Sequence, residues 1–107
     1  MAVKVRNKKQ DPSLKQIVKA LAQYAAGHPM AEIEVYRHNI VSVRIRIIDP
    51  TFKGMSRGER EVDLWALFNE LPEEVVQDIS IVILLTPTES KKSFASMEFD
   101  DPIPSRI

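Results

Sequence analysis

The feature that most constrains the fold is an alternation of apolar and polar residues from Ala31 to Ile48. A period of two places successive side chains on opposite faces of a β-strand, so this segment predicts a β-hairpin with one buried face. A loop centred on Asn39 brings apolar residues opposite one another and acidic residues opposite arginines. The register predicted in this way contains four pairs: Ile33 with Ile45, Val35 with Val43, Glu34 with Arg44, and Glu32 with Arg46.

Helical spacing of apolar residues replaces this alternation on both sides of the hairpin. The pair Asp11 and Pro12 is typical of a helix start, because the carboxylate accepts unpaired amides and proline fits the first turn. Gly27 is typical of a helix end. After the hairpin, Ser56 and Glu59 have the spacing of a capping box and predict the start of a second helix.

A short run rich in β-branched residues, Ile79 to Leu85, predicts a third strand. Its long connection to the hairpin predicts a right-handed crossover that places it parallel to one hairpin strand. Thr86 and Glu89 again have capping-box spacing, which predicts a short last helix. We therefore expect an α+β fold in the order α-β-β-α-β-(α), with a mixed three-stranded sheet and the helices packed on one face.

Length and composition favour a single domain. The chain has 107 residues, of which 44% are hydrophobic and 28% charged, close to globular averages. We expect a flexible basic arm over residues 1–10, the α/β domain over residues 11–97 and an extended tail over residues 98–107. The first residues contain no apolar stretch long enough for a signal peptide or an anchor, so we expect a cytoplasmic protein with no membrane partner.

Composition also narrows the chemistry. The chain has no cysteine, which excludes disulfides, thiolate metal ligands and cysteine nucleophiles. His28 and His38 are the only histidines, and their separation is not that of a metal site. Because these histidines and the scattered carboxylates form no recognisable catalytic set, we expect no enzymatic activity, no cofactor and no metal site.

The segment from Phe52 to Thr86 carries a more specific pattern. Its first part, Phe52-Lys53-Gly54-Met55-Ser56-Arg57-Gly58-Glu59-Arg60, is similar to the Phe-x-Gly-x-Ser-x-x-x-Arg loop and helix start of the BolA-like family. Leu64-Trp65, Leu71, the strand from Ile79 and Thr86-Pro87-Thr88-Glu89 follow at family-like spacing. The chain thus resembles a divergent BolA-like protein, which implies a variant of the KH-type fold and an adaptor or regulatory role through protein contacts.

The departures from this family bear on its metal chemistry. BolA-like proteins typically carry histidines at three positions where this chain has Ser42, Glu61 and Asp78. Some members share iron–sulfur clusters with monothiol glutaredoxins and contribute histidine as the ligand. Because carboxylates are harder ligands than imidazole, the resemblance implies the scaffold without iron–sulfur ligation.

On the predicted register, the second face of the sheet is the candidate contact surface. It carries Tyr36, Arg44 and Arg46 beside Val82 and Leu84, and exposed apolar residues of this size require a cover. We rank the chain's own C-terminal segment first, a homodimer second and an unknown protein partner third, because the tail is tethered. The covering residues expected in the C-terminal segment are Phe94, Met97 and Phe99.

Nucleic-acid binding on a KH-like scaffold is the alternative function. Helix starts attract anions, and the residues expected to contact phosphates are Lys53, Gly54, Ser56, Arg57 and Arg60. The segment lacks the Gly-x-x-Gly clamp of KH domains, however, and is not a P-loop. Fifteen basic residues also balance fifteen acidic ones, which removes the positive field of non-specific nucleic-acid binders.

Overall fold

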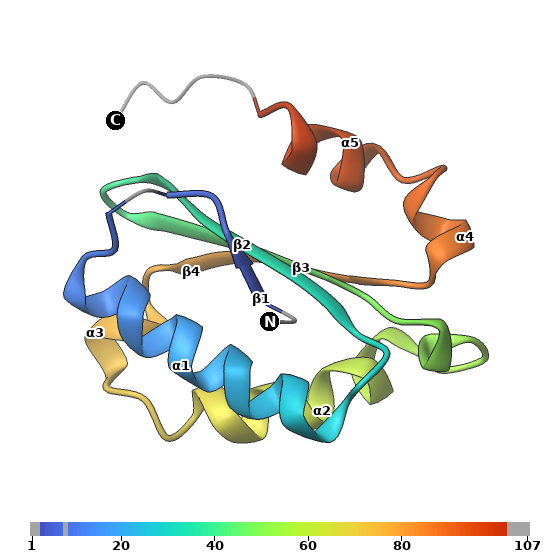
Figure 1. The fold of residues 1–107 in the computed structure, drawn as a ribbon, viewed down its shortest axis with the longest axis horizontal. Coiled ribbons are helices and arrows are strands. Elements are labelled where there is room, and N and C mark those ends of the chain that lie inside the picture. The colour runs from blue at the N-terminus through green and yellow to red at the C-terminus, as the bar shows by residue number, and fades with distance from the viewer. Residues whose placement is uncertain (1–2, 8, 103–107) are drawn as a thin grey trace.

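The computed structural model describes residues 3–7 and 9–102, which form a sheet with helices on both sides (Figure 1). The strands are β1 (Val3–Val5), β2 (Glu32–Asn39), β3 (Ser42–Ile48) and β4 (Ile79–Leu85). The helices are α1 (Pro12–Gly27), α2 (Arg57–Phe68), α3 (Glu73–Val76), α4 (Pro87–Ser90) and α5 (Phe94–Asp100), with a 3-10 turn, η1 (Pro50–Phe52), after β3. The α+β class expected from the sequence is confirmed.

The sheet has four strands in the order β1-β2-β3-β4, so the predicted number of three is wrong. β1 pairs parallel with β2, β2 pairs antiparallel with β3, and β4 runs parallel to β3, as the crossover predicted. The additional strand lies within the segment expected to be a flexible arm. It is ordered because Val3 pairs with Ile33 and buries its side chain in the core.

The hairpin register differs from the prediction by two residues. Ile33 lies opposite Ile47 and Glu34 opposite Arg46, with an irregularity between Arg37 and Asn39. The turn lies beyond Asn39, whose side chain accepts a hydrogen bond from the Val41 amide at 2.9 Å. A shift of two residues leaves every side chain on its predicted face, because side chains alternate with a period of two.

The helix starts follow the predicted caps. The Asp11 side chain accepts the Leu14 amide at 2.9 Å, and α1 runs from Pro12 to Gly27 as expected. Reciprocal capping-box hydrogen bonds between Ser56 and Glu59 open α2. Thr86 and Glu89 form the same box at the start of α4.

The main core lies between one face of the sheet and α1, α2 and α3 (Figure 1). Its members are apolar side chains with almost no exposure, among them Leu14, Ile17, Leu21, Ile45, Leu64 and Phe68. Packing of this kind supplies most of the stability of a small domain. Five of these six side chains come from α1 and α2, which therefore cover this face of the sheet.

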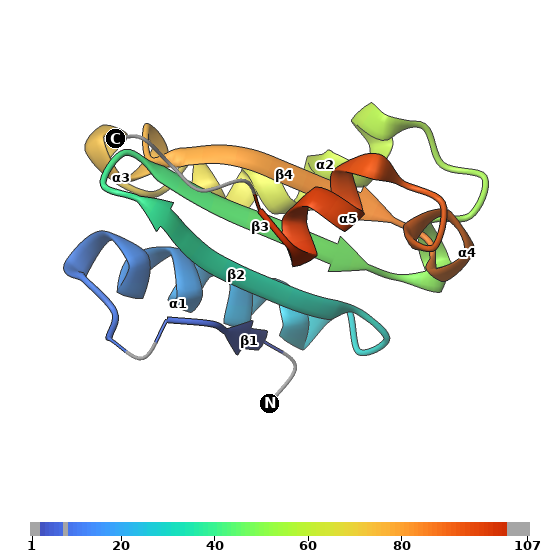
Figure 2. The same ribbon diagram turned by 90° about the horizontal axis from the view of Figure 1, so that it is seen from above.

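The C-terminal segment does not form the extended tail expected from residue 98. Helix α5 continues to Asp100 and lies over the face of the sheet opposite α1, so the helices do not all pack on one face (Figure 2). Ser93 caps α5 by accepting the Ser96 amide at 3.1 Å, and Phe99 is buried at 1% exposure. The remainder of the expected tail, residues 103–107, lies outside the described residues.

A second irregularity reverses the expected faces of β4. Val43 pairs with Ile79 and Arg44 with Ile81, so Ser80 is an extra residue in the parallel ladder. One extra residue exchanges the two faces of a strand for all residues that follow. Ile81, Ile83 and Leu85 therefore belong to the cluster beneath α5, whereas Val82 and Leu84 pack against the main core.

Candidate functional site

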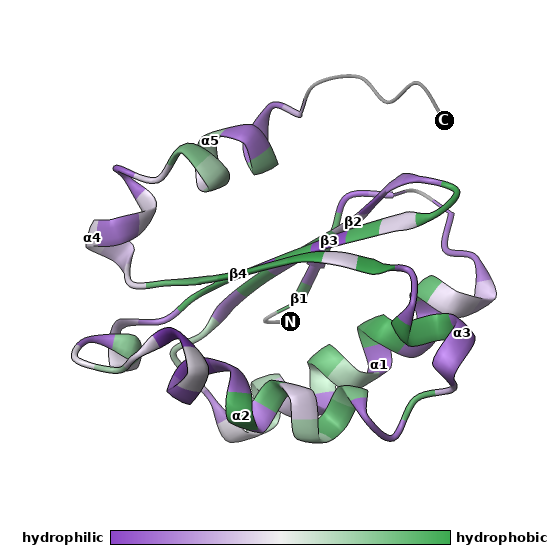
Figure 3. Ribbon diagram, turned by 180° about the vertical axis from the view of Figure 1, so that it is seen from behind, coloured by the Kyte–Doolittle hydropathy of each residue, from purple (hydrophilic) through white to green (hydrophobic). Residues whose placement is uncertain are grey.

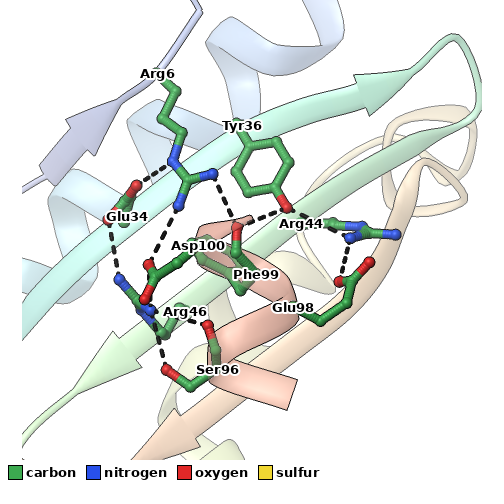
Figure 4. Close-up of polar contacts among 9 residues, drawn as sticks. All are labelled: Arg6, Glu34, Tyr36, Arg44, Arg46, Ser96, Glu98, Phe99 and Asp100. Carbon is green, nitrogen blue, oxygen red and sulfur yellow. Dashed lines mark hydrogen bonds and ion pairs between the residues drawn. The ribbon is translucent and has the colours of Figure 1, made fainter. Parts of the chain in front are cut away.

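Helix α5 rests on a polar surface of the sheet, here called the α5 seat, formed by Arg6, Glu34, Tyr36, Arg44 and Arg46 (Figure 4). The Tyr36 hydroxyl donates to the carbonyl oxygen of Phe99 at 3.0 Å. The two aromatic rings meet edge to face, with their centroids 4.8 Å apart. The guanidinium groups of Arg6 and Arg46 lie 4.8 Å and 4.7 Å from the Phe99 ring centroid.

Ion pairs neutralise the seat. The Glu34 carboxylate accepts from both Arg6 and Arg46, the latter at 3.1 Å. Two acidic residues of α5 complete the arrangement, because Glu98 pairs with Arg44 and Asp100 pairs with Arg46 at 2.7 Å. Three guanidinium groups thus face three carboxylates, and the chain itself satisfies the charge of this surface.

The five residues expected to form the contact face therefore divide into two groups. Tyr36, Arg44 and Arg46 lie together beneath α5. Val82 and Leu84 do not join them, so this part of the prediction is wrong for the reason given by the extra Ser80. Helix α5 covers the α5 seat, and the apolar side chains beside the seat come from Ile81, Ile83 and Leu85.

The chain's own C-terminal segment covers the α5 seat, but only one of the three residues expected to do so, Phe99, is buried there. Phe99 is buried against Tyr36 and Ile83. Phe94 and Met97 are 84% and 50% exposed and contribute little to the cover. Because α5 is only seven residues long, its docking depends on Phe99 and the ion pairs.

At the start of α2, where anion contacts were expected, the polar groups of Ser56 and Arg60 are already bonded to other residues of the chain. The Glu59 carboxylate accepts the Ser56 amide at 2.8 Å, and this hydrogen bond lowers the pKa of Glu59. Arg60 is only 11% exposed and donates to the Leu84 carbonyl at 3.0 Å and to Glu89 at 2.7 Å. The hydrogen bond from Arg60 lowers the pKa of Glu89 to about 2. Among the residues expected to contact phosphates, three are exposed and have no internal ion pair as close as that of Arg60: Lys53, Gly54 and Arg57.

An open groove of about 570 Å³ lies along β4, here called the edge groove. Its floor is Val82 to Leu85. One wall comes from residues 55–61, around the start of α2, and the other from residues 89–95, which run from α4 into the start of α5. The charged residues that line it are Arg57, Arg60, Glu61, Glu89 and Lys92.

β4 is an edge strand, and no other strand in the described part of the chain pairs with its outer side. The Leu85 carbonyl points toward β3, because it accepts the Asp49 amide at 2.9 Å. The Leu84 carbonyl points outward to Arg60. Backbone groups alternate along a strand, so the amide and carbonyl of Val82 also point outward, into the edge groove.

This strand is unusually apolar for an edge. Its sequence, Ile-Ser-Ile-Val-Ile-Leu-Leu, contains no charge and no proline, and Figure 3 shows it as an almost continuous hydrophobic ribbon. Proteins commonly protect edge strands with lysine, proline or bulges, since a bare edge pairs with other chains. β4 has neither lysine nor proline, and its one irregularity, at Ser80, lies before the residues that line the edge groove. The predicted sheet already places this strand at an edge beside one strand of the hairpin, and the structure shows that the partner is β3.

The two histidines each contact a tyrosine ring. His28 stacks on Tyr24 with the ring centroids 3.9 Å apart, and its ring nitrogens lie 2.8 Å from the Tyr24 carbonyl and 3.2 Å from Asp63. Burial, with the nearby charges of Asp49 and Asp63, raises the pKa of Tyr24 to about 12. His38 lies at the edge of the Tyr36 ring.

The BolA-like resemblance leads one to expect histidine at three positions of this chain, and the residues found there contact different partners. Ser42 is hydrogen-bonded to Ser80, and Asp78 accepts from Arg37 at 2.9 Å. Glu61 lines the edge groove, 3.7 Å from Arg57. Across residues 3–7 and 9–102, no three carboxylate or imidazole side chains gather in a way that could hold a metal ion.

Comparison with known proteins gives no match, whether to family models, to curated proteins or to solved structures. None of the helices in the described part of the chain is long and apolar enough to cross a bilayer. The function is therefore inferred from the α5 seat and the edge groove.

Proposed function

We propose that this chain is a non-enzymatic binding module that acts through protein contacts, and that an extended segment of a partner protein pairs with β4 in the edge groove. The single observation that carries the proposal is the bare, apolar outer edge of β4. Addition of a strand to such an edge is a common mode of peptide recognition, in which main-chain hydrogen bonds supply affinity and side-chain pockets supply specificity.

The walls of the groove support this mode of binding. Arg60 joins α2 to α4 through Glu89 and so holds the two walls at a fixed separation. A strand bound between the walls contacts apolar side chains from both, Met55 on one side and Ala95 on the other. Walls that are already in place reduce the ordering cost that a partner has to overcome.

The resemblance of Phe52 to Thr86 to the BolA-like family agrees with an adaptor role and stays a prediction. Nucleic-acid binding at the helix start has less support. Glu59 already accepts from the Ser56 amide, and Arg60 already has Glu89 as its partner. A cytoplasmic location is likewise part of the proposal.

Selection of peptides from a displayed random library tests the proposal. Selected peptides are then titrated against the wild type and the variant Val82→Pro, because proline removes the outward amide while leaving the inward ladder to β3 in place. We expect about a tenfold loss of affinity, which corresponds to one or two backbone hydrogen bonds.

The matched control is Val82→Ala, which trims the side chain and keeps the amide. We expect it to bind the same peptides within about threefold of the wild type, since no backbone hydrogen bond is lost. Equal affinity of the wild type and Val82→Pro would contradict the proposal. A dimer that forms through β4 would appear instead as a change in solution mass that Val82→Pro abolishes.

A further inference from the structure

The chemistry of the partner segment follows from the closed end of the edge groove, provided that the proposed function holds. We propose that the segment is the carboxyl terminus of a partner protein, bound as a short strand parallel to β4 with its terminal carboxylate between Arg57 and Lys92. Neither the amino-acid pattern nor the BolA-like resemblance indicates such a site.

The groove is closed at the C-terminal end of β4. Arg60 reaches from α2 across the outer edge, donates to the Leu84 carbonyl at 3.0 Å and pairs with Glu89 of α4 at 2.7 Å. A strand that pairs with Val82 and continues in this direction would have to break both contacts. A strand that ends there leaves them intact, so the geometry favours a chain terminus over an internal segment.

Charge at this end favours a carboxylate. The groove is lined by three basic residues and two acidic ones, an excess of one positive charge. Arg60 takes up the charge of Glu89, and the contact of Arg57 with Glu61 is long, at 3.7 Å. The Arg57 side chain is 87% exposed. The backbone amide of Lys92 donates to the Glu89 carbonyl at 3.1 Å, but the Lys92 side chain has no hydrogen bond or ion pair with the other described residues. A carboxylate placed between these two cations would complete the charge balance.

The direction of the bound segment follows from the direction of β4. This strand runs toward Leu85, and the closed end lies at Leu84. A segment whose carboxyl terminus lies at the closed end therefore runs parallel to β4, as β4 itself runs parallel to β3. Met55 and Ala95 flank the space for its last side chains, which we expect to be apolar.

Peptides with free and blocked termini test this inference. A library of random heptapeptides displayed at a free carboxyl terminus is selected against the full chain, and each selected peptide is synthesised as the free acid and as the amide. We expect amidation to weaken binding about tenfold, because it removes the charge that faces two cations. Equal affinity of acid and amide would overturn the inference.

Charge reversals locate the carboxylate. We expect Arg57→Glu and Lys92→Glu each to weaken binding of the free acid by about threefold or more, as for exposed ion pairs, and to leave the amide unchanged. Lys91→Glu is the matched control, because Lys91 is exposed next to Lys92 but lines a different surface, and we expect no effect. A Lys91→Glu loss equal to that of Lys92→Glu would indicate a general field effect and contradict the assignment.

The two proposals fail in different ways. If acid and amide bind equally and Val82→Pro still weakens binding about tenfold, an internal segment pairs with β4, and only the carboxyl-terminal inference is lost. If the selected peptides bind regardless of Val82→Pro, the edge is not the binding site, and the proposed function is lost with it. Binding of single-stranded nucleic acid that is lost in Arg57→Glu would overturn both.

Discussion

Replacement of Phe99 by alanine tests whether α5 is an integral part of the fold. The ring is 1% exposed, meets Tyr36 edge to face and lies between two guanidinium groups. Burial of the ring contributes about 2–3 kcal/mol, and the aromatic pair adds about 1 kcal/mol. The ion pairs of α5 are partly exposed and add less than about 1 kcal/mol each. We therefore expect Phe99→Ala to lower the free energy of unfolding by about 3 kcal/mol.

Urea unfolding followed by the fluorescence of Trp65 measures this change, because Trp65 packs against Phe68 in α2 and reports on the main core. Hydrogen exchange over α5 measures the local effect, and we expect its amides to lose protection in Phe99→Ala. Phe94→Ala is the matched control on the same helix, with a side chain that is 84% exposed, and we expect a change below about 0.5 kcal/mol. If Phe99→Ala is no more destabilising than Phe94→Ala, α5 does not depend on the seat in the way described.

Three further predictions concern stability. Gly54 has φ +81°, so Gly54→Ala should lower the free energy of unfolding in urea by about 1–2 kcal/mol. Gly58→Ala should be neutral or stabilising, because Gly58 lies within α2 and no atom is near the added methyl group. The reverse order of stabilities would contradict the left-handed conformation assigned to Gly54. The hydrogen bond from Arg37 lowers the pKa of the Asp11 carboxyl below its usual 3.8. The ion pair of Asp11 and Arg37 therefore stabilises the fold fully above about pH 3.8, and this stabilisation is lost as pH falls through the lower pKa that Asp11 has in the folded chain. The difference in urea midpoint between the wild type and Asp11→Asn, which keeps the helix cap, should therefore shrink below about pH 3.8, and a constant difference would show that the charge is irrelevant. Thr86→Ala, which removes the cap of α4, should lower the free energy of unfolding by about 1 kcal/mol, and an unchanged midpoint would mean that α4 adds nothing to the cooperative fold.

Local signals in the sequence predict the elements well. Asp11, Ser56 and Thr86 each accept the amide that their capping pattern predicts, because a cap depends only on residues three or four positions apart. The strand from Ile79 to Leu85 also appears as predicted. Such features need no knowledge of the rest of the chain.

Features that depend on distant contacts could not be predicted in the same way. The short segment Val3–Val5 becomes a strand only because β2 offers it an edge. The extra residue Ser80 exchanges the faces of β4, and nothing in its local sequence indicates the irregularity. Both effects shape the α5 seat, because the pairing of β1 with β2 brings Arg6 to it and the extra residue decides which side chains of β4 lie beneath α5.

The most direct test of the account is hydrogen exchange at the amide of Val82, measured residue by residue in the presence and absence of a selected peptide. The outward direction of this amide, away from β3, predicts rapid exchange in the free chain and at least about tenfold protection when the peptide is bound. The amide of Ile83 points toward β3 and serves as the internal reference, with little change. Protection that appears over α5 or at the Lys53 turn, while Val82 stays unprotected, would contradict binding at the edge of β4.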